Sequence, residues 1–433
     1  MVEALLALQL VVLGFGFPYI FARDRLFGIY FFFLFLYAIP AEIGYFYFSE
    51  LSVLIRAYFE PNAWYPAATS VLLSTLLFVL LFAVLRGRFL AAIPFKLEIS
   101  PSKNKAPRAW IAILGLLAIA CYQSLYLVAN YSNISWFTAQ AEASLSSDPA
   151  YFLFVFLLKI SVAITITLYV LVRMKSSLID IGYLRPMFLV FFVLFVIVAI
   201  RLGNRTDLLA FALGVATFES YRMSFNLKRV AIALFAAAAL AVTLTMVESL
   251  RYEDGRPELD LVAAVMVQDY YPPAHMLFAS VAHGIVDPSE VILSNFSNSL
   301  VMLDFPLLQN VITEVFLPGV ATRSAGYAFY VLTEGYMFAG TFGFLYNATV
   351  LMLGLSLWRR LAISNSREFN LFLLALMGCM LVNLVRSQTA YFIKYLYMFV
   401  TPGVFLYLCL TGMRVRVRAL VSWGRTPGEF VGL

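Results

Sequence analysis

Basic residues and one glutamate at the ends of apolar segments are the side chains in this sequence that could do chemistry. Arg201 and Arg205 lie in the stretch Arg-Leu-Gly-Asn-Arg-Thr-Asp, and Glu334 lies in Tyr-Val-Leu-Thr-Glu-Gly-Tyr. Arginine keeps its proton and offers bidentate donors, so several guanidinium groups gathered together would bind a phosphate or pyrophosphate. A carboxylate partly removed from water could act as a general base. Seven other basic residues also lie outside the loops that hold most of the Lys and Arg: Arg56, Lys159, Arg251, Arg256, Arg323, Arg386 and Lys394.

The composition indicates what must position these residues. Of the 433 residues, 63% are hydrophobic and only 12% are charged, whereas an ordinary soluble domain has about 25% charged residues. One core could not hide so much apolar surface, which excludes a water-soluble enzyme. A bilayer core of about 30 Å takes roughly 20 apolar residues per helix, so the chain has room for about ten to a dozen spans. We predict an all-α polytopic membrane protein.

Continuous apolar runs divide the chain. They lie at about 3–21, 26–48, 66–85, 109–129, 150–172, 183–200, 206–219, 229–247, 328–357, 369–385 and 391–412. These predict about eleven transmembrane helices, of which the ninth is long enough to tilt. The predicted organisation is an N-terminal membrane bundle over 1–247, a large loop over 248–327, three further helices over 328–412 and a tail over 413–433.

The Lys and Arg residues predict the orientation. Loops on one side, following every odd-numbered run, hold 21 of the 30 basic residues and six acids. Their net charge is therefore +15, and that of the rest of the chain is −9. Because cytoplasmic loops retain basic residues, we expect a periplasmic N-terminus and a cytoplasmic C-terminus.

The large loop lies on the outer side in this topology and contains both histidines, His275 and His283. Segments 259–269 and 306–316 mix apolar and polar residues, which favours short amphipathic helices at the membrane surface. The alternative is a solvated connector. Loops of this length usually carry function, so we favour a functional loop.

The outer basic residues also have a structural interpretation. Asp207 could neutralise Arg205, and Asp254 could neutralise Arg256. Likewise Glu334 could form an ion pair that fixes the loop, and Glu42 with Lys159 could form an intramembrane pair. The arginines persist at several separate turns on the side where acids outnumber bases, and this favours a binding site.

The remaining sequence motifs give no support for nucleotide or metal chemistry. Gly326, Gly335, Gly340 and Gly343 have a spacing typical of close helix packing. The sequence contains neither the GxxxxGK[ST] nucleotide-binding motif nor the HExxH metal motif. The basic cytoplasmic loops are explained by topology and anionic lipid, so no nucleic-acid partner is expected.

The chain resembles the Wzy-type polymerases of O-antigen and oligosaccharide repeat units. The resemblance lies in the plan of about eleven spans, in the outer turn from Arg201 to Ala210, in Arg251-Tyr252 opening the large loop, and in the stretch from Ser324 to Gly343 that closes it. The plan covers nearly the whole chain, and the local motifs cover about a tenth of it. O-antigen ligases share the many spans, the large outer loop and the outer arginines.

The resemblance implies a GT-C-like glycosyltransferase of the bacterial inner membrane that needs neither a metal ion nor a cofactor. Its substrates would be undecaprenyl-diphosphate-linked oligosaccharides within the membrane lipids, and its partners a chain-length regulator and a flippase of the same pathway. Arg201, Arg205 and Arg251 match the family's basic positions, Glu334 matches its acidic position, and His275 is the alternative base. The expected binding residues further include Asn204, Arg256, Arg323, Tyr336, Arg386 and Lys394.

Two other functions fit the sequence. An O-antigen ligase would perform the same chemistry with a lipid A core acceptor. A flippase or other transporter should show two related halves and charges near the middle of the membrane, but the sequence shows no internal repeat. A polymerase is therefore the favoured prediction.

Overall fold

The computed structural model describes residues 2–39, 64–92, 95–101, 106–131, 149–174, 181–201, 205–222, 277, 287–300, 308 and 329–419. The α-helices are α1 (Val2–Arg23), α2 (Arg25–Leu36), α5 (Trp64–Ala92), α6 (Ala106–Tyr131), α8 (Pro149–Met174), α9 (Ile181–Arg201), α10 (Arg205–Arg222), α14 (Pro288–Leu300), α17 (Val331–Ala339), α18 (Gly343–Leu361), α19 (Arg367–Val385), α20 (Tyr391–Tyr395) and α21 (Thr401–Thr411). A 3-10 turn, η3 (Gly340–Phe342), a π-helical turn, η4 (Leu396–Val400), and strands β1 (Phe95–Pro101) and β2 (Met413–Ala419) complete the described elements.

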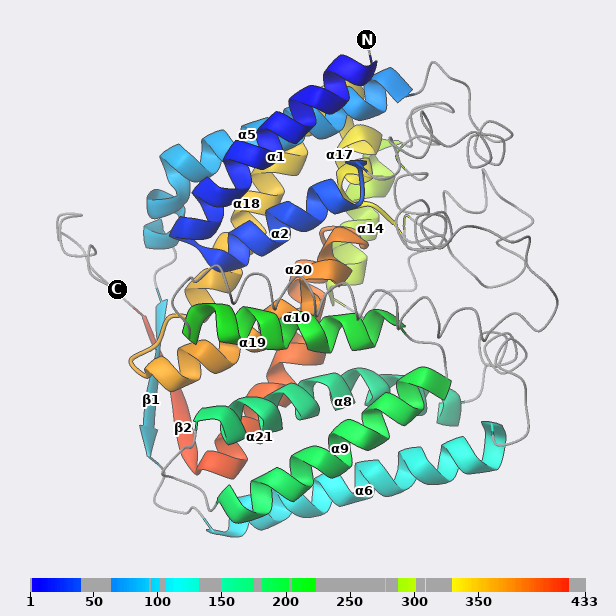
Figure 1. Ribbon diagram of the computed structural model, residues 1–433, viewed down its shortest axis with the longest axis vertical. Helices are drawn as coiled ribbons and strands as arrows, with labels where there is room; N and C mark the ends of the chain where they lie inside the picture. Colours follow the sequence, from blue (N-terminus) through cyan, green and yellow to red (C-terminus); the bar gives the residue numbers. More distant parts are fainter. Residues whose placement is uncertain are drawn as a thin grey trace.

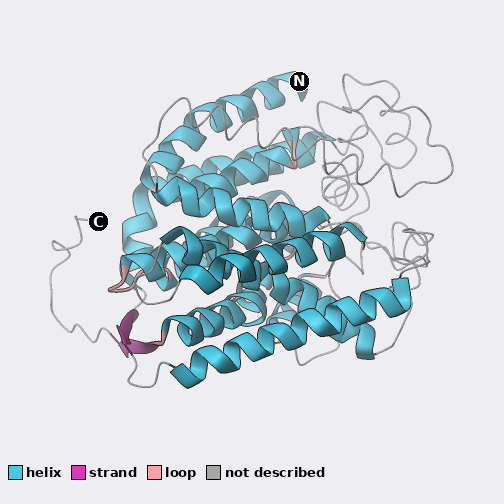
Figure 2. Ribbon diagram, turned by 60° about the horizontal axis from the view of Figure 1, so that its bottom comes forward, coloured by secondary structure: helices cyan, strands magenta, loops and turns pink. Residues whose placement is uncertain are grey.

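Long apolar helices dominate the described chain (Figures 1 and 2). Seven of them are long and apolar enough to cross a membrane, and two shorter apolar helices accompany them. The predicted apolar runs coincide with described helices, except that 26–48 is described only as far as residue 39 and 229–247 lies outside the described residues. The prediction of a helical membrane-spanning protein is thus confirmed.

One end of the bundle, which we call the basic end, collects the positively charged turns. Asp24 follows α1 and is 3% exposed. It accepts hydrogen bonds from Arg86 (2.9 Å), Arg359 (2.8 Å) and the Tyr221 hydroxyl (2.8 Å). Since these residues come from the ends of α5, α18 and α10, the four connections meet at one place. This agrees with the alternation predicted from the Lys and Arg positions.

The two strands at the basic end were not predicted. β1 and β2 pair antiparallel, with Glu98 opposite Arg416 and Ile99 opposite Val415. The alternation of arginine and valine in Met-Arg-Val-Arg-Val-Arg-Ala is typical of a half-buried strand. The tail predicted over 413–433 therefore begins with a strand, whose pairing partner is distant in the sequence. The pairing depends on where the bundle brings the ends of α5 and α21.

The ninth run is also not one long helix. It breaks at Gly340, whose φ of 57° is the left-handed conformation that favours glycine. The chain then folds back, and α17 packs on α18 with Gly335 against Gly343. A Cβ atom at either glycine would overlap the backbone of the other. The expectation of close packing is confirmed for this pair, although within a helical hairpin rather than between separate spans.

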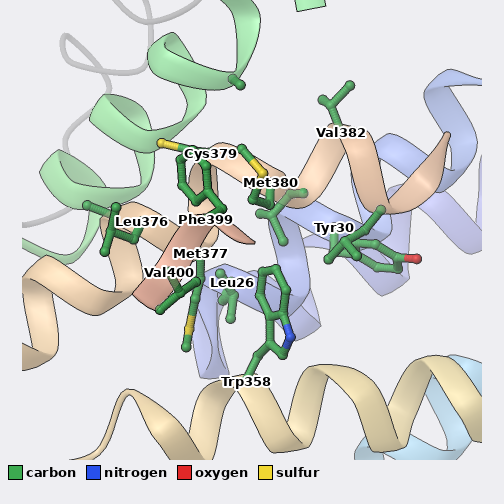
Figure 3. Packing of buried hydrophobic residues seen from close by; sticks show 14 of the residues in the cluster. Leu26, Tyr30, Trp358, Leu376, Met377, Cys379, Met380, Val382, Phe399 and Val400 are labelled. Carbon is green, nitrogen blue, oxygen red and sulfur yellow. The ribbon is translucent and has the colours of Figure 1, made fainter. Parts of the chain in front are cut away.

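The centre of the bundle is α19, whose span is 78% buried. Figure 3 shows Trp358 of α18 directed toward Leu26 of α2 and Met377 of α19. The Trp358 indole N–H donates to the carbonyl of Phe392 (2.8 Å), so this buried donor is satisfied. α19 therefore holds α10, α2 and α8 together and fixes where its own ends lie.

Replacing Gly335 or Gly343 by Ala should destabilise the protein by roughly 1–3 kcal/mol, because the new methyl group forces α17 from α18. Gly115→Ala is the matched control, since a Cβ atom there meets nothing within 4 Å, and it should be neutral or stabilising by up to about 1 kcal/mol. Thermal unfolding in detergent measures both. Equal effects of the three substitutions would contradict the packing.

Candidate functional site

Glu334 is fully buried in the first turn of α17, where four donors surround its carboxylate. Oε1 accepts hydrogen bonds from Asn295 Nδ2 (2.6 Å), from Thr389 Oγ1 (2.6 Å) and from the Tyr346 hydroxyl. Oε2 accepts the backbone N–H of Thr389 (2.7 Å). The donors come from α14, α18 and the turn after α19. One carboxylate on α17 therefore ties this helix to α14, to α18 and to the turn after α19.

A second layer of polar contacts supports this network. Asn295 Oδ1 accepts from Gln388 Nε2 (3.1 Å) and from the Ala390 N–H (3.3 Å). Gln388 Oε1 in turn accepts the backbone N–H of Leu308 (3.1 Å). The turn over residues 386–390 is thus held from both sides, by Glu334 and by α14.

The helix α14 lies within the large predicted loop, and its polar side carries the contacts. Ser294 and Asn298 are buried, whereas Ile292 and Phe296 are exposed. Asp287 begins the helix by accepting the N–H of Ser289 (2.9 Å), which lowers the pKa of this exposed carboxyl group. The amphipathic helices predicted at 259–269 and 306–316 lie outside the described residues apart from Leu308, so α14 is an element the sequence analysis did not predict.

The environment of Glu334 limits what it can do chemically. No described Lys or Arg pairs with it, so the ion pair considered from the sequence is not formed with any of these residues. Four neutral donors stabilise the carboxylate instead. A substrate hydroxyl would have to displace one of them before Glu334 could accept its proton. The observed geometry suits a residue that positions its neighbours.

Arg386 lies at the C-terminal end of α19, three residues before Thr389. Its Nη1 is 3.5 Å from Thr206 Oγ1 in the first turn of α10, and its guanidinium lies over the ring of Tyr37. α9 ends at Arg201 and α10 begins at Arg205, so Arg386 lies beside the turn that carries the two predicted arginines. The turn over residues 386–390 thus contacts both Glu334, through Thr389, and the start of α10, through Arg386.

Asp207 is the second buried carboxylate at this end. Lys159 of α8 donates to its Oδ1 at 2.5 Å, and Asp207 is fully buried. Its Oδ2 has no hydrogen-bond partner among the described residues. The sequence suggested Glu42 as the partner of Lys159 and Arg205 as the partner of Asp207. In the structure Lys159 bonds to Asp207. Neither suggested pair is tested, because Glu42 and the side chain of Arg205 lie outside the described residues.

The remaining predicted residues are not joined to the network by a described contact. Lys394 lies over the ring of Tyr391, and Tyr336 is half-buried on α17. Asn204, Arg251, Arg256, His275 and Arg323 lie outside the described residues, as do the side chains of Arg201 and Arg205. In the ranges that are described, no three His, Cys, Asp or Glu side chains lie close enough together to hold a metal ion.

The sequence analysis missed Asn295, Tyr346, Gln388 and Thr389. Neutral polar residues give no charge signal, and their contact with Glu334 depends on the fold. The stretch Ser294-Asn295 with Asn298-Ser299 repeats polar residues at helical spacing, and this pattern could have predicted the polar side of α14.

A double-mutant cycle on Asn295→Ala and Glu334→Ala should give a coupling free energy of about 1–3 kcal/mol, because the two side chains share a buried hydrogen bond. In the control cycle, Asn295→Ala combined with Glu219→Ala at the basic end should be additive within about 0.5 kcal/mol. Chemical or thermal unfolding provides the values. Additivity of the first pair would mean that Glu334 does not hold α14.

Removing Lys159 should destabilise the protein more than neutralising Asp207. Lys159→Met leaves a fully buried carboxylate without its cation, at a cost of about 3–5 kcal/mol. Asp207→Asn leaves the half-exposed Lys159 with access to water, so the loss is smaller. Unfolding temperatures of the two variants provide the comparison, and the opposite order would contradict the pairing.

The described residues thus place a buried carboxylate, an arginine and a buried ion pair around the turn after α19 and the start of α10. Comparison with known proteins adds no relative. No family model, no curated protein and no solved structure matches this chain.

Proposed function

We propose that this protein is a membrane glycosyltransferase that polymerises oligosaccharide repeat units carried on a lipid diphosphate. The observation that carries the proposal is the turn over residues 386–390. Its Arg386 contacts the start of α10, next to Arg205, while its Thr389 binds Glu334. Basic positions that are far apart in the sequence thereby come from α9, α10 and α19 to one end of the bundle, as a diphosphate site requires.

The orientation belongs to the same proposal. Cytoplasmic loops retain Lys and Arg, so the basic end faces the cytoplasm and the 386–390 turn faces the periplasm of a bacterial inner membrane. The N-terminus is then periplasmic and the C-terminus cytoplasmic. Lipid-linked substrates can reach this end from the outer leaflet, and a GT-C-like arrangement of spans leaves the large loop on the same side.

The reaction joins two lipid-linked glycans. A hydroxyl group of the incoming repeat unit attacks the anomeric carbon of the growing chain, and a new carbon–oxygen bond forms. The bond from that carbon to the diphosphate oxygen breaks, and the lipid diphosphate leaves with the bonding electrons. A protein base takes the hydroxyl proton. Fixed cations directed at the diphosphate stabilise the negative charge that develops on it.

The roles within the site follow from the contacts. Arg386, Arg201 and Arg205 bind the leaving diphosphate, together with Arg251 from the start of the loop. Glu334, which already accepts four hydrogen bonds, positions the 386–390 turn. The role of base then passes to His275, the alternative that the sequence offers.

A transporter of lipid-linked glycans is the second candidate. The ion pair between Lys159 and the buried Asp207 lies inside the helical bundle, where transporters carry functional charges. A ligase would keep the proposed chemistry and change only the acceptor. The three functions differ in what they do to a purified lipid-linked repeat unit.

The deciding experiment reconstitutes the purified protein with lipid-linked repeat units. A polymerase extends them into a ladder; a ligase requires added lipid A core; a transporter moves them across the bilayer unchanged. Ladder formation should fall by about 100-fold or more in Arg201→Ala, Arg205→Ala and Arg386→Ala, because each removes a donor to the transition state. His275→Ala should abolish it, and Glu334→Gln should retain measurable polymer.

Arg173→Ala is the matched control, since Arg173 is an exposed cation at the basic end that pairs with Glu219. It should leave the ladder unchanged. Normal ladders from all three outer arginine variants, with expression confirmed, would refute the diphosphate site. Complete loss in Glu334→Gln at normal stability would return the role of base to Glu334.

A further inference from the structure

Arg360 is a buried residue at the basic end, and its charge is not neutralised by any described residue. Arg360 belongs to the last turn of α18 and is 6% exposed. Among the residues that the structure describes, its buried Nε has no hydrogen-bond partner and no carboxylate pairs with the side chain. The adjacent Arg359, by contrast, is neutralised by Asp24 at 2.8 Å. Burying an unpaired cation is costly, so the site favours an anion.

A row of basic residues lies on the neighbouring sheet. In the register of β1 and β2, Lys96 is opposite Arg418, Glu98 opposite Arg416 and Ser100 opposite Arg414. Directly opposed residues share a face, so Arg414, Arg416 and Glu98 occupy one side of this two-stranded sheet, and the two arginines form its basic row. Arg414 and Arg416 are exposed. This face carries a surplus of positive charge.

The end of α18 is attached to that sheet. Leu97 of β1 forms a bridge with Ser364, four residues after Arg360. Asn365 Oδ1 accepts the N–H of Ile99 (2.6 Å), and its Nδ2 donates to the carbonyl of Ile99 (3.0 Å). The buried arginine and the basic row therefore belong to one assembled part of the structure.

The position of this part relative to the membrane identifies the anion. The apolar helix α18 ends at Leu361, one residue after Arg360, and β2 begins at Met413, two residues after the candidate span Tyr391–Thr411 ends. Both features thus lie where an apolar span meets water, which is the depth of lipid headgroups. The charged groups found there are lipid phosphates.

We infer that Arg360 and the basic row of the β1–β2 sheet bind the phosphate of an anionic phospholipid headgroup. Planar guanidinium groups match phosphate oxygens with paired hydrogen bonds. The headgroup neutralises Arg360, and Arg416 holds it from the sheet. The site does not depend on the proposed polymerase activity, because it lies at the opposite end of the bundle from Glu334.

The test compares the full-length protein in nanodiscs of phosphatidylcholine alone and of phosphatidylcholine with phosphatidylglycerol. Competition by phosphatidylglycerol for a labelled anionic lipid gives the affinity. Arg416→Gln should weaken it about fivefold, and Arg360→Met about tenfold or more, because its guanidinium is desolvated. Arg222→Gln, which removes an exposed cation paired with Glu219 at the same end, should change it less than twofold.

The unfolding temperature is a second measurement, in which Arg360→Met has a different effect without and with the anionic lipid. In phosphatidylcholine alone, Arg360→Met should unfold at the same or a higher temperature than the wild type, since an unpaired buried charge has been removed. With phosphatidylglycerol present, the wild type should gain stability and Arg360→Met should not.

Wild-type affinity in both Arg360→Met and Arg416→Gln would overturn the inference, as would an equal loss in Arg222→Gln. Inorganic phosphate that stabilises the wild type as well as the lipid would overturn the lipid as the occupant.

Discussion

A charged side chain inside an apolar helical bundle must be stabilised by the protein itself, because the hydrocarbon tails of the lipid offer it no partners. Within the part of the chain that the structure describes, three buried acids meet this constraint in different ways. Asp24 uses two arginines and a tyrosine, Asp207 uses one lysine, and Glu334 uses only neutral donors. Asp24 and Glu334 draw their partners from several helices, and Asp207 joins α10 to α8. The acids therefore decide which helix ends come together, and apolar packing fills the space between.

The two ends of the bundle use this constraint differently. At the basic end, Asp24 compensates Arg86 and Arg359, so the surrounding helix ends are fixed by strong ion pairs. At the other end, Glu334 leaves its negative charge to hydrogen bonds, and Arg386 remains without a described carboxylate. A cation that is held in place but not neutralised is what an anionic ligand requires. This difference supports placing the proposed site beside the 386–390 turn.

Much of the fold could be predicted from the sequence because its signals are local. Apolar runs of span length predicted the helices, and alternating Lys and Arg positions predicted which turns share an end. The paired strands could not be predicted, because Glu98 and Arg416 meet only once α5 and α21 are packed. Nor could the break at Gly340, since a continuous apolar run conceals a left-handed glycine.

The candidate site was predictable where it depends on charge. Glu334 and Arg386 stood out because charges are rare at the ends of apolar runs, and the structure places both at the turn after α19. No such signal marks Asn295, Tyr346 and Thr389, because they are neutral. The network that fixes Glu334 is therefore evident only in the folded structure. The partner of Lys159 was missed because the sequence offered several acids and no measure of distance.

The central position of α19 has a consequence for synthesis in the membrane. Its neighbours α2, α8 and α10 all precede it in the chain. When the ribosome delivers α19, most of the surface that receives it has already been made, including Gly214 and Thr217, against which Cys379 and Gly378 pack. A nascent chain that stops before residue 367 presents that receiving surface to lipid. Membrane quality control can therefore recognise an incomplete product by the exposed helix surfaces that α19 would cover.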